Sequence, residues 1–152
     1  MRSMIFMRFM MFIVATVAWA NSAQAASTNA QKLEAYCYGY WQDLTESFIG
    51  SGEVLGKSLD DCSTRDNCDE VLKQMKIVLE RAKLALSQKN QRADTYFSTV
   101  KIFLEKSDVV GVSELRAAEK QGKHDSEILR DPSADHTEVE PRVAQCHDPN
   151  VQ

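Results

Sequence analysis

The sequence has little proline, and what it has lies near the C-terminus. Pro132, Pro141 and Pro149 are its three prolines, and none occurs over residues 26–131. Proline interrupts helices because it lacks a backbone donor and its ring clashes with the preceding turn. Its absence from so long a span leaves that span open to helix.

An excess of basic residues is also lacking. The formal net charge is −4, from 18 Lys and Arg against 22 Asp and Glu. A general nucleic-acid binder needs a basic surface to pair with phosphates, so the charge argues against such a partner. A length of 152 residues with 43% hydrophobic residues is typical of one globular domain.

A long apolar run occurs only at the N-terminus. Arg2 and Arg8 precede an apolar stretch over residues 9–20, and Ala23-Gln24-Ala25 follows it. A basic start, a short apolar run and a small-x-small exit are typical of a secretory signal peptide. The run is shorter than the ~20 residues that a membrane-spanning helix needs. We expect cleavage near Ala25, a periplasmic or secreted mature chain, and no stable membrane anchor afterwards.

Four cysteines remain in the expected mature chain: Cys37, Cys62, Cys68 and Cys146. An even number in an exported chain indicates two disulfides. The sequence contains neither CxxC nor CxxCH, and the spacing of Cys62 and Cys68 is too wide for a zinc knuckle. Thiol redox enzymes, c-type cytochromes and zinc sites are therefore not supported.

The first predicted helix begins near residue 29. Thr28 and Gln31 can form a capping box. Leu33, Cys37, Tyr40, Leu44 and Phe48 then follow at steps of three and four, which is the spacing of one helix face. The helix either continues to about residue 60 or bends at Gly50-Ser51-Gly52, because glycine weakens a helix by ~1 kcal/mol relative to alanine.

The choice between these two helices decides the disulfide pairing. In an unbroken helix, Cys37 lies ~35 Å from Cys62 at 1.5 Å per residue, whereas bonded cysteines need Cα atoms within ~7 Å. Cys37–Cys146 with Cys62–Cys68 would then form. If the chain doubles back at the glycines, Cys37–Cys62 with Cys68–Cys146 becomes possible. We favour the first pairing.

Periodicity predicts further helices after the cysteine loop. A second helix runs from Asn67 to a turn at Lys89-Asn90-Gln91. A third helix spans 93–106, with Phe97 and Leu104 among its inward residues. An apolar link at 109–112 leads to a short helix over 113–121, which stops at Gly122. The expected fold is a small all-α, disulfide-stabilised bundle of three to four helices within 26–123.

The remaining residues, 124–152, are expected to form an irregular acidic tail tied back through Cys146. They carry two basic and seven acidic side chains and all three prolines. All three histidines, His124, His136 and His147, also lie there, outside the predicted helices. Haem and metal sites in bundles draw their ligands from facing helices, so no cofactor or metal site is expected.

Catalytic motifs are missing as well. The sequence has no GxSxG motif, no phosphate-binding glycine loop, and no EF-hand pattern in the acidic stretch that begins at Asp60. The helical part offers no histidine to activate a nucleophile. We name no catalytic residue and expect that the protein is not an enzyme.

An aromatic cluster, Tyr36, Tyr38, Tyr40 and Trp41, is the most unusual local feature. Tyr40 falls on the buried stripe, with Tyr36 and Trp41 beside it, while Tyr38 points elsewhere. Tyrosine and tryptophan are enriched at binding hot spots, which makes Tyr38 and Trp41 possible partner contacts. The alternative is that three of the four fill the core and Tyr38 only covers the surface.

The segment Cys37-Tyr38-Gly39-Tyr40 resembles a C-x-G-Y pattern on an early helix of small exported immunity proteins. The resemblance covers these four residues and the general layout of signal, helices and terminal cysteine. It implies an all-α, disulfide-bonded protein that neutralises a cell-wall-degrading effector of neighbouring bacteria.

The sequence thus predicts an exported, non-enzymatic protein that binds an unknown protein partner. One alternative is an immunity-type inhibitor of a toxin or cell-wall hydrolase. Another is a small periplasmic chaperone or stress protein.

Overall fold

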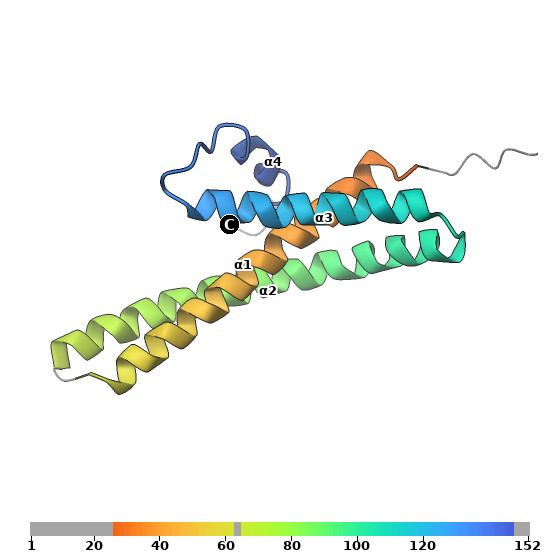
Figure 1. The fold of residues 1–152 in the computed structure, drawn as a ribbon. Coiled ribbons are helices and arrows are strands. Elements are labelled where there is room, and N and C mark those ends of the chain that lie inside the picture. The colour runs from red at the N-terminus through yellow and green to blue at the C-terminus, as the bar shows by residue number, and fades with distance from the viewer. Residues whose placement is uncertain (1–25, 63–64, 148–152) are drawn as a thin grey trace, which may run out of the picture.

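A computed structural model describes residues 26–62 and 65–147 (Figure 1). These residues form four helices and no strand: α1 (Asn29–Asp60), α2 (Arg65–Glu105), α3 (Val109–Arg130) and α4 (Glu140–Ala144). The expected all-α, disulfide-stabilised bundle is confirmed. The expected signal peptide, residues 1–25, lies outside the described residues.

Helix α1 begins at the predicted capping box. The Thr28 hydroxyl accepts a hydrogen bond from the Gln31 backbone N–H at 3.2 Å, and the Gln31 side chain accepts one from the Thr28 N–H at 2.8 Å. The helix then continues without interruption through Gly50 and Gly52 to Asp60. The unbroken form of the first helix is therefore the correct one.

Helix α2 shows that the predicted turn at Lys89-Asn90-Gln91 is wrong, because one helix of 41 residues passes through it. This stretch contains neither glycine nor proline, so nothing local ends the helix. Residues on both sides of it pack into the rest of the molecule: Gln88 is buried, and Arg92 Nη1 donates to Glu34 Oε1 of α1 at 2.7 Å.

A tight turn joins α2 to α3. Ser107 adopts a left-handed conformation with φ 56°, and the Asp108 N–H donates to the Phe103 carbonyl at 2.9 Å, as in a Schellman motif. The Asp108 side chain then caps α3 by accepting from the Gly111 N–H at 2.9 Å. Helix α3 consequently absorbs the predicted link at 109–112.

The predicted end of this helix at Gly122 is wrong, because α3 continues past that residue. A methyl group at Gly122 would overlap the Tyr36 carbonyl oxygen of α1, and one at Gly39 of α1 would overlap the Glu119 carbonyl oxygen of α3. The two glycines let the helices cross with their backbones in contact. The helix runs on to Arg130, so residues 124–130 belong to it rather than to the tail.

The four helices form a thicker region, where α3 packs on the α1–α2 pair, and a thinner region, where that pair lies alone. Helices α1 and α2 lie antiparallel, and α3 crosses the N-terminal half of α1 from the other side (Figure 1). The far end of the α1–α2 pair extends beyond α3. We call residues 46–62 and 65–84 the arm, and residues 26–45 and 85–147 the body.

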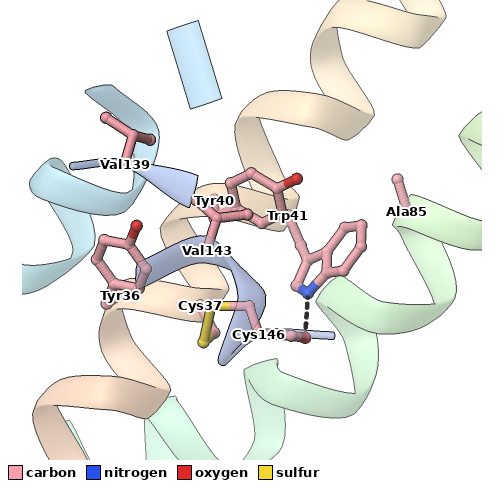
Figure 2. Packing of buried hydrophobic residues seen from close by; sticks show 8 residues of the cluster. All are labelled: Tyr36, Cys37, Tyr40, Trp41, Ala85, Val139, Val143 and Cys146. Atoms are coloured by element: carbon pink, nitrogen blue, oxygen red, sulfur yellow. Dashed lines mark hydrogen bonds between the residues drawn. A yellow bond between two sulfur atoms is a disulfide. The ribbon is translucent and has the colours of Figure 1, made fainter. Parts of the chain in front are cut away.

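The C-terminal segment closes the body over α1. A disulfide joins Cys37 to Cys146, with Cα atoms 5.2 Å apart, and a second joins Cys62 to Cys68, with Cα atoms 5.5 Å apart. This is the pairing that we favoured for an unbroken first helix. Val139 and Val143, at the start of α4 and within it, are buried against the same cluster (Figure 2).

Candidate protein-binding surface

Trp41, which we considered as a partner contact, lies in the core. Only 5% of it is exposed, and its ring stands edge-on to Tyr40 at 4.9 Å between centroids. Its indole Nε1 donates to the Cys146 carbonyl at 3.2 Å (Figure 2). In this structure Trp41 positions the C-terminal segment and offers no surface to a partner.

The three fixed residues of the C-x-G-Y pattern also lie in the interior of the body. Cys37 is fully buried in the disulfide to Cys146, Gly39 forms the backbone contact with α3, and Tyr40 is buried in the cluster of Figure 2. Burial raises the pKa of Tyr40 to about 12. The three residues that carry the resemblance therefore serve the fold of the body.

Tyr38, between these residues, faces a different way. Its ring stacks on Tyr96 of α2, with centroids 4.9 Å apart and planes 17° apart, and stands edge-on to Phe97 at 5.4 Å. Tyr38 is half-buried, whereas 55% of Phe97 is exposed. The expectation that Phe97 and Leu104 face inward is wrong, because Tyr96 and Phe103 take the buried positions of this part of α2 and Leu104 is 61% exposed.

These aromatic rings line a hollow of about 290 Å³ to which α1, α2 and α3 all contribute. The lining residues are Tyr38 and Gln42 of α1, Tyr96, Phe97 and Val100 of α2, and Arg116 and Glu119 of α3. We call this the Phe97 hollow. The lining combines aromatic and aliphatic side chains with about as much polar surface from Gln42, Arg116 and Glu119. Aromatic residues and arginine are the types enriched where proteins bind one another.

Hydrogen bonds fix the α3 side of the hollow. The Tyr96 hydroxyl donates to Glu119 at 2.7 Å, and Lys123 pairs with the same carboxylate at 3.4 Å. Burial, followed by the hydrogen bond to Glu119 and its charge, raises the pKa of Tyr96. Because the phenol stays protonated, it remains a donor and holds Glu119 at the rim.

Apolar side chains extend this surface along one flank of α2. At 100° per residue, the exposed Leu72, Leu79, Leu86, Phe97 and Leu104 fall within about 40° of each other around the helix. Helix α3 does not extend over the far end of the α1–α2 pair (Figure 1), and Leu72 and Leu79 there are 48% and 47% exposed. Several large apolar side chains on one exposed flank are more typical of a contact surface than single scattered ones.

A second cluster of polar residues is centred on one carboxylate inside the body. Asp125 is fully buried and accepts hydrogen bonds from the Tyr36 hydroxyl at 2.7 Å, Gln121 Nε2 at 2.8 Å, and Arg142 Nε and Nη2 at 2.8 and 3.1 Å. Burial alone would raise the pKa of Asp125, but these hydrogen bonds outweigh it and lower the pKa. The cluster ties α1, α3 and α4 together.

No feature of the sequence pointed to Asp125 as a buried residue. We had placed it in the solvated acidic tail, together with His124, which lies exposed on α3. The spacing of Gln121 and Asp125, four residues apart on one helix, was the available signal, but it has meaning only once the helix is known to pass Gly122.

Two further features were sought in the described part of the chain, a metal-binding cluster and a membrane-spanning helix. Within residues 26–62 and 65–147, no three side chains of His, Cys, Asp or Glu are grouped so that they could hold a metal ion. No helix among them is long and apolar enough to cross a membrane.

Comparison with known proteins places no relative beside this chain: no protein family, no curated protein and no solved structure matches it.

Proposed function

We propose that this protein is exported, has no catalytic activity, and acts by binding another protein through the Phe97 hollow. The observation that carries the proposal is the exposure of Phe97 above a stacked tyrosine pair. Exposed aromatic side chains beside half-buried ones supply large contact area at a low entropy cost, which is why they dominate binding hot spots.

Export is supported by the two disulfides and by the N-terminal segment. Disulfides persist in the periplasm and outside the cell and are rare in the reducing cytosol. Cys37 and Cys146, 109 residues apart in the sequence, tie the C-terminal segment to α1. A fold that depends on such a bond suits an oxidising compartment.

A single specific partner is the form of binding that the hollow favours, and an immunity-type inhibitor of a toxin or cell-wall hydrolase would act in this way. A chaperone for unfolded proteins is the second candidate. The exposed apolar flank of α2, with Leu72 and Leu79 in the arm and Leu86 at the edge of the body, supports it, because such side chains can hold unfolded clients.

The test is to capture partners from the cell envelope with the tagged mature chain and with two matched variants. Phe97→Ala removes the exposed ring of the hollow. Ile102→Ala removes a side chain of similar exposure from the other flank of α2. Thermal melting must show that both variants fold as the unmodified protein does.

We expect one stoichiometric partner, held equally by Ile102→Ala and at least tenfold more weakly by Phe97→Ala, since truncating a hot-spot residue costs about 2 kcal/mol or more. Many unfolded clients in place of one partner would favour the chaperone. Equal capture by the unmodified protein and Phe97→Ala would contradict the proposed surface.

A further inference from the structure

The α3 side of the Phe97 hollow is basic, although the chain as a whole carries a net charge of −4. Arg116, Lys120 and Lys123 are spaced by four and three residues, which places them on one face of α3. Arg116 lines the hollow. Lys123 lies within 3.4 Å of Glu119, another residue of the lining.

The carboxylates near this row leave it with an excess of positive charge. Glu119 is engaged by the Tyr96 hydroxyl and by Lys123, and only 22% of its side chain is exposed. On the α1 side, Glu46 accepts a hydrogen bond from the neutral Gln42 amide at 3.1 Å and keeps its negative charge. The three cations of the row still outnumber Glu119 and Glu46. Arg116 and Lys120 are both exposed, and no carboxylate among the described residues lies within 4.0 Å of either.

We propose that the partner segment for this hollow is acidic: it places an aromatic or large aliphatic side chain on Phe97 and an adjacent Asp or Glu on Arg116 and Lys120. This proposal rests on the proposed function and adds the chemistry of the partner. The apolar anchor supplies most of the affinity, because it is the part that leaves water. The acidic neighbour supplies specificity and speeds association.

The geometry of the cations suits a carboxylate in particular. Arginine presents a planar fork of donors that can bind both oxygens of a carboxylate. Lys120, one turn along α3 from Arg116, adds a second positive charge on the same face. A basic partner segment would meet the same two charges and be repelled.

The test is a selection of random twelve-residue peptides, displayed on phage, against the immobilised mature chain. Four forms of the protein are compared. They are the unmodified chain, Phe97→Ala, the double variant Arg116→Glu with Lys120→Glu, and the double variant Lys73→Glu with Lys76→Glu, which makes the same charge change on the arm. Circular dichroism melting shows that each form is folded before it is used.

We expect the unmodified chain and the arm variant to select peptides that combine an aromatic or large aliphatic residue with Asp or Glu. The Arg116/Lys120 variant should select Lys and Arg in place of the acids. It should bind a synthetic peptide from the first selection at least tenfold more weakly, and that peptide should bind the unmodified chain less tightly at higher salt.

Two results would overturn the proposal in distinguishable ways. Peptides that depend on Phe97 but carry no acidic residue, or whose charge does not change with the Arg116/Lys120 variant, would contradict the acidic partner and leave the binding surface intact. Failure of every form to select a peptide whose binding depends on Phe97 would contradict both this inference and the proposed function.

Discussion

The arm and the body are built from the same two helices, yet they differ in what holds them. In the body, side chains of α1 and α2 are buried beneath α3 and the C-terminal segment. In the arm, none of the side chains that the structure describes is buried. A helix pair alone therefore excludes little water here, and the third layer makes the core.

The glycines of the two regions also differ in the space that surrounds them. In the arm, a methyl group at Gly50 or Gly56 would meet no atom within 4 Å. In the body, one at Gly39 or Gly122 would overlap the backbone of the opposing helix. The same residue type is therefore dispensable in one region and required in the other.

The largest expected effect separates the two disulfides. Replacing Cys37 and Cys146 by alanine should lower the free energy of unfolding by ~5 kcal/mol, and replacing Cys62 and Cys68 by ~2 kcal/mol. The bonds close loops with sequence separations of 109 and 6 residues, and a longer loop restricts the unfolded chain more. Denaturant unfolding of both double variants measures the difference, and equal losses would contradict it.

The next effect concerns the helix crossing in the body. Gly122→Ala should destabilise the protein by about 3 kcal/mol, because the added methyl group overlaps the rigid backbone of α1. The matched control is Gly50→Ala in the arm, which should stabilise the protein by about 1 kcal/mol through helix propensity. Urea unfolding of the pair measures both changes. If both variants destabilised the protein alike, the two glycines would not differ as described.

Raising the pH above 10 should destabilise the body of the protein. All four tyrosines lie there, and burial raises the pKa of Tyr40 to about 12. An unfolded tyrosine ionises near pH 10, so the stability that depends on neutral Tyr40 is complete below pH 10 and is lost as the pH rises toward 12. The difference between these two pKa values corresponds to an expected contribution of about 3 kcal/mol from Tyr40. Phenolate absorbance at 295 nm, recorded with helical circular dichroism, should rise only as the protein unfolds.

Full ionisation of the tyrosines near pH 10 in a protein that stays folded would be the contrary result.

A smaller effect concerns the buried carboxylate of the body. Asp125→Asn should destabilise the protein by about 2 kcal/mol at neutral pH, because it weakens the hydrogen bonds from Tyr36 and Arg142. The pKa of Asp125 is lowered. Its contribution is therefore present above the unfolded value of about 4 and is lost as the pH falls through the folded-state pKa.

The matched control is Asp43→Asn, which breaks the pair between Asp43 and Arg130 at the edge of the body. That pair is partly exposed, and its loss should cost less than about 1 kcal/mol. Unfolding curves at pH 7 and at pH 3 test both variants. A difference between unmodified and Asp125→Asn protein that does not shrink in acid would contradict the assignment.

The parts of the fold that could be predicted from the sequence depend on local signals. The Thr28–Gln31 capping box fixed the start of α1, and a stripe at steps of three and four indicated its buried face. The length of that helix then favoured the cysteine pairing, because 1.5 Å per residue separates Cys37 from Cys62.

The parts that could not be predicted depend on contacts between distant residues. A polar stretch at 89–91 looks like a turn until Arg92 is known to pair with Glu34 of α1. Gly122 carries the same local signal whether it ends a helix or lets two helices touch. For the candidate site, the sequence singled out Tyr38 as a possible contact, which stays a prediction, whereas the exposure of Phe97 depends on which ring of α2 packs under α1.

Hydrogen exchange along α2 tests the difference between arm and body most directly, because one unbroken helix passes through both regions. We expect amides of residues 88–103, in the body, to exchange only when the whole protein unfolds. Amides of residues 70–84, in the arm, should exchange at least ~100-fold faster through local opening. Uniform protection along the whole of α2 would contradict the account.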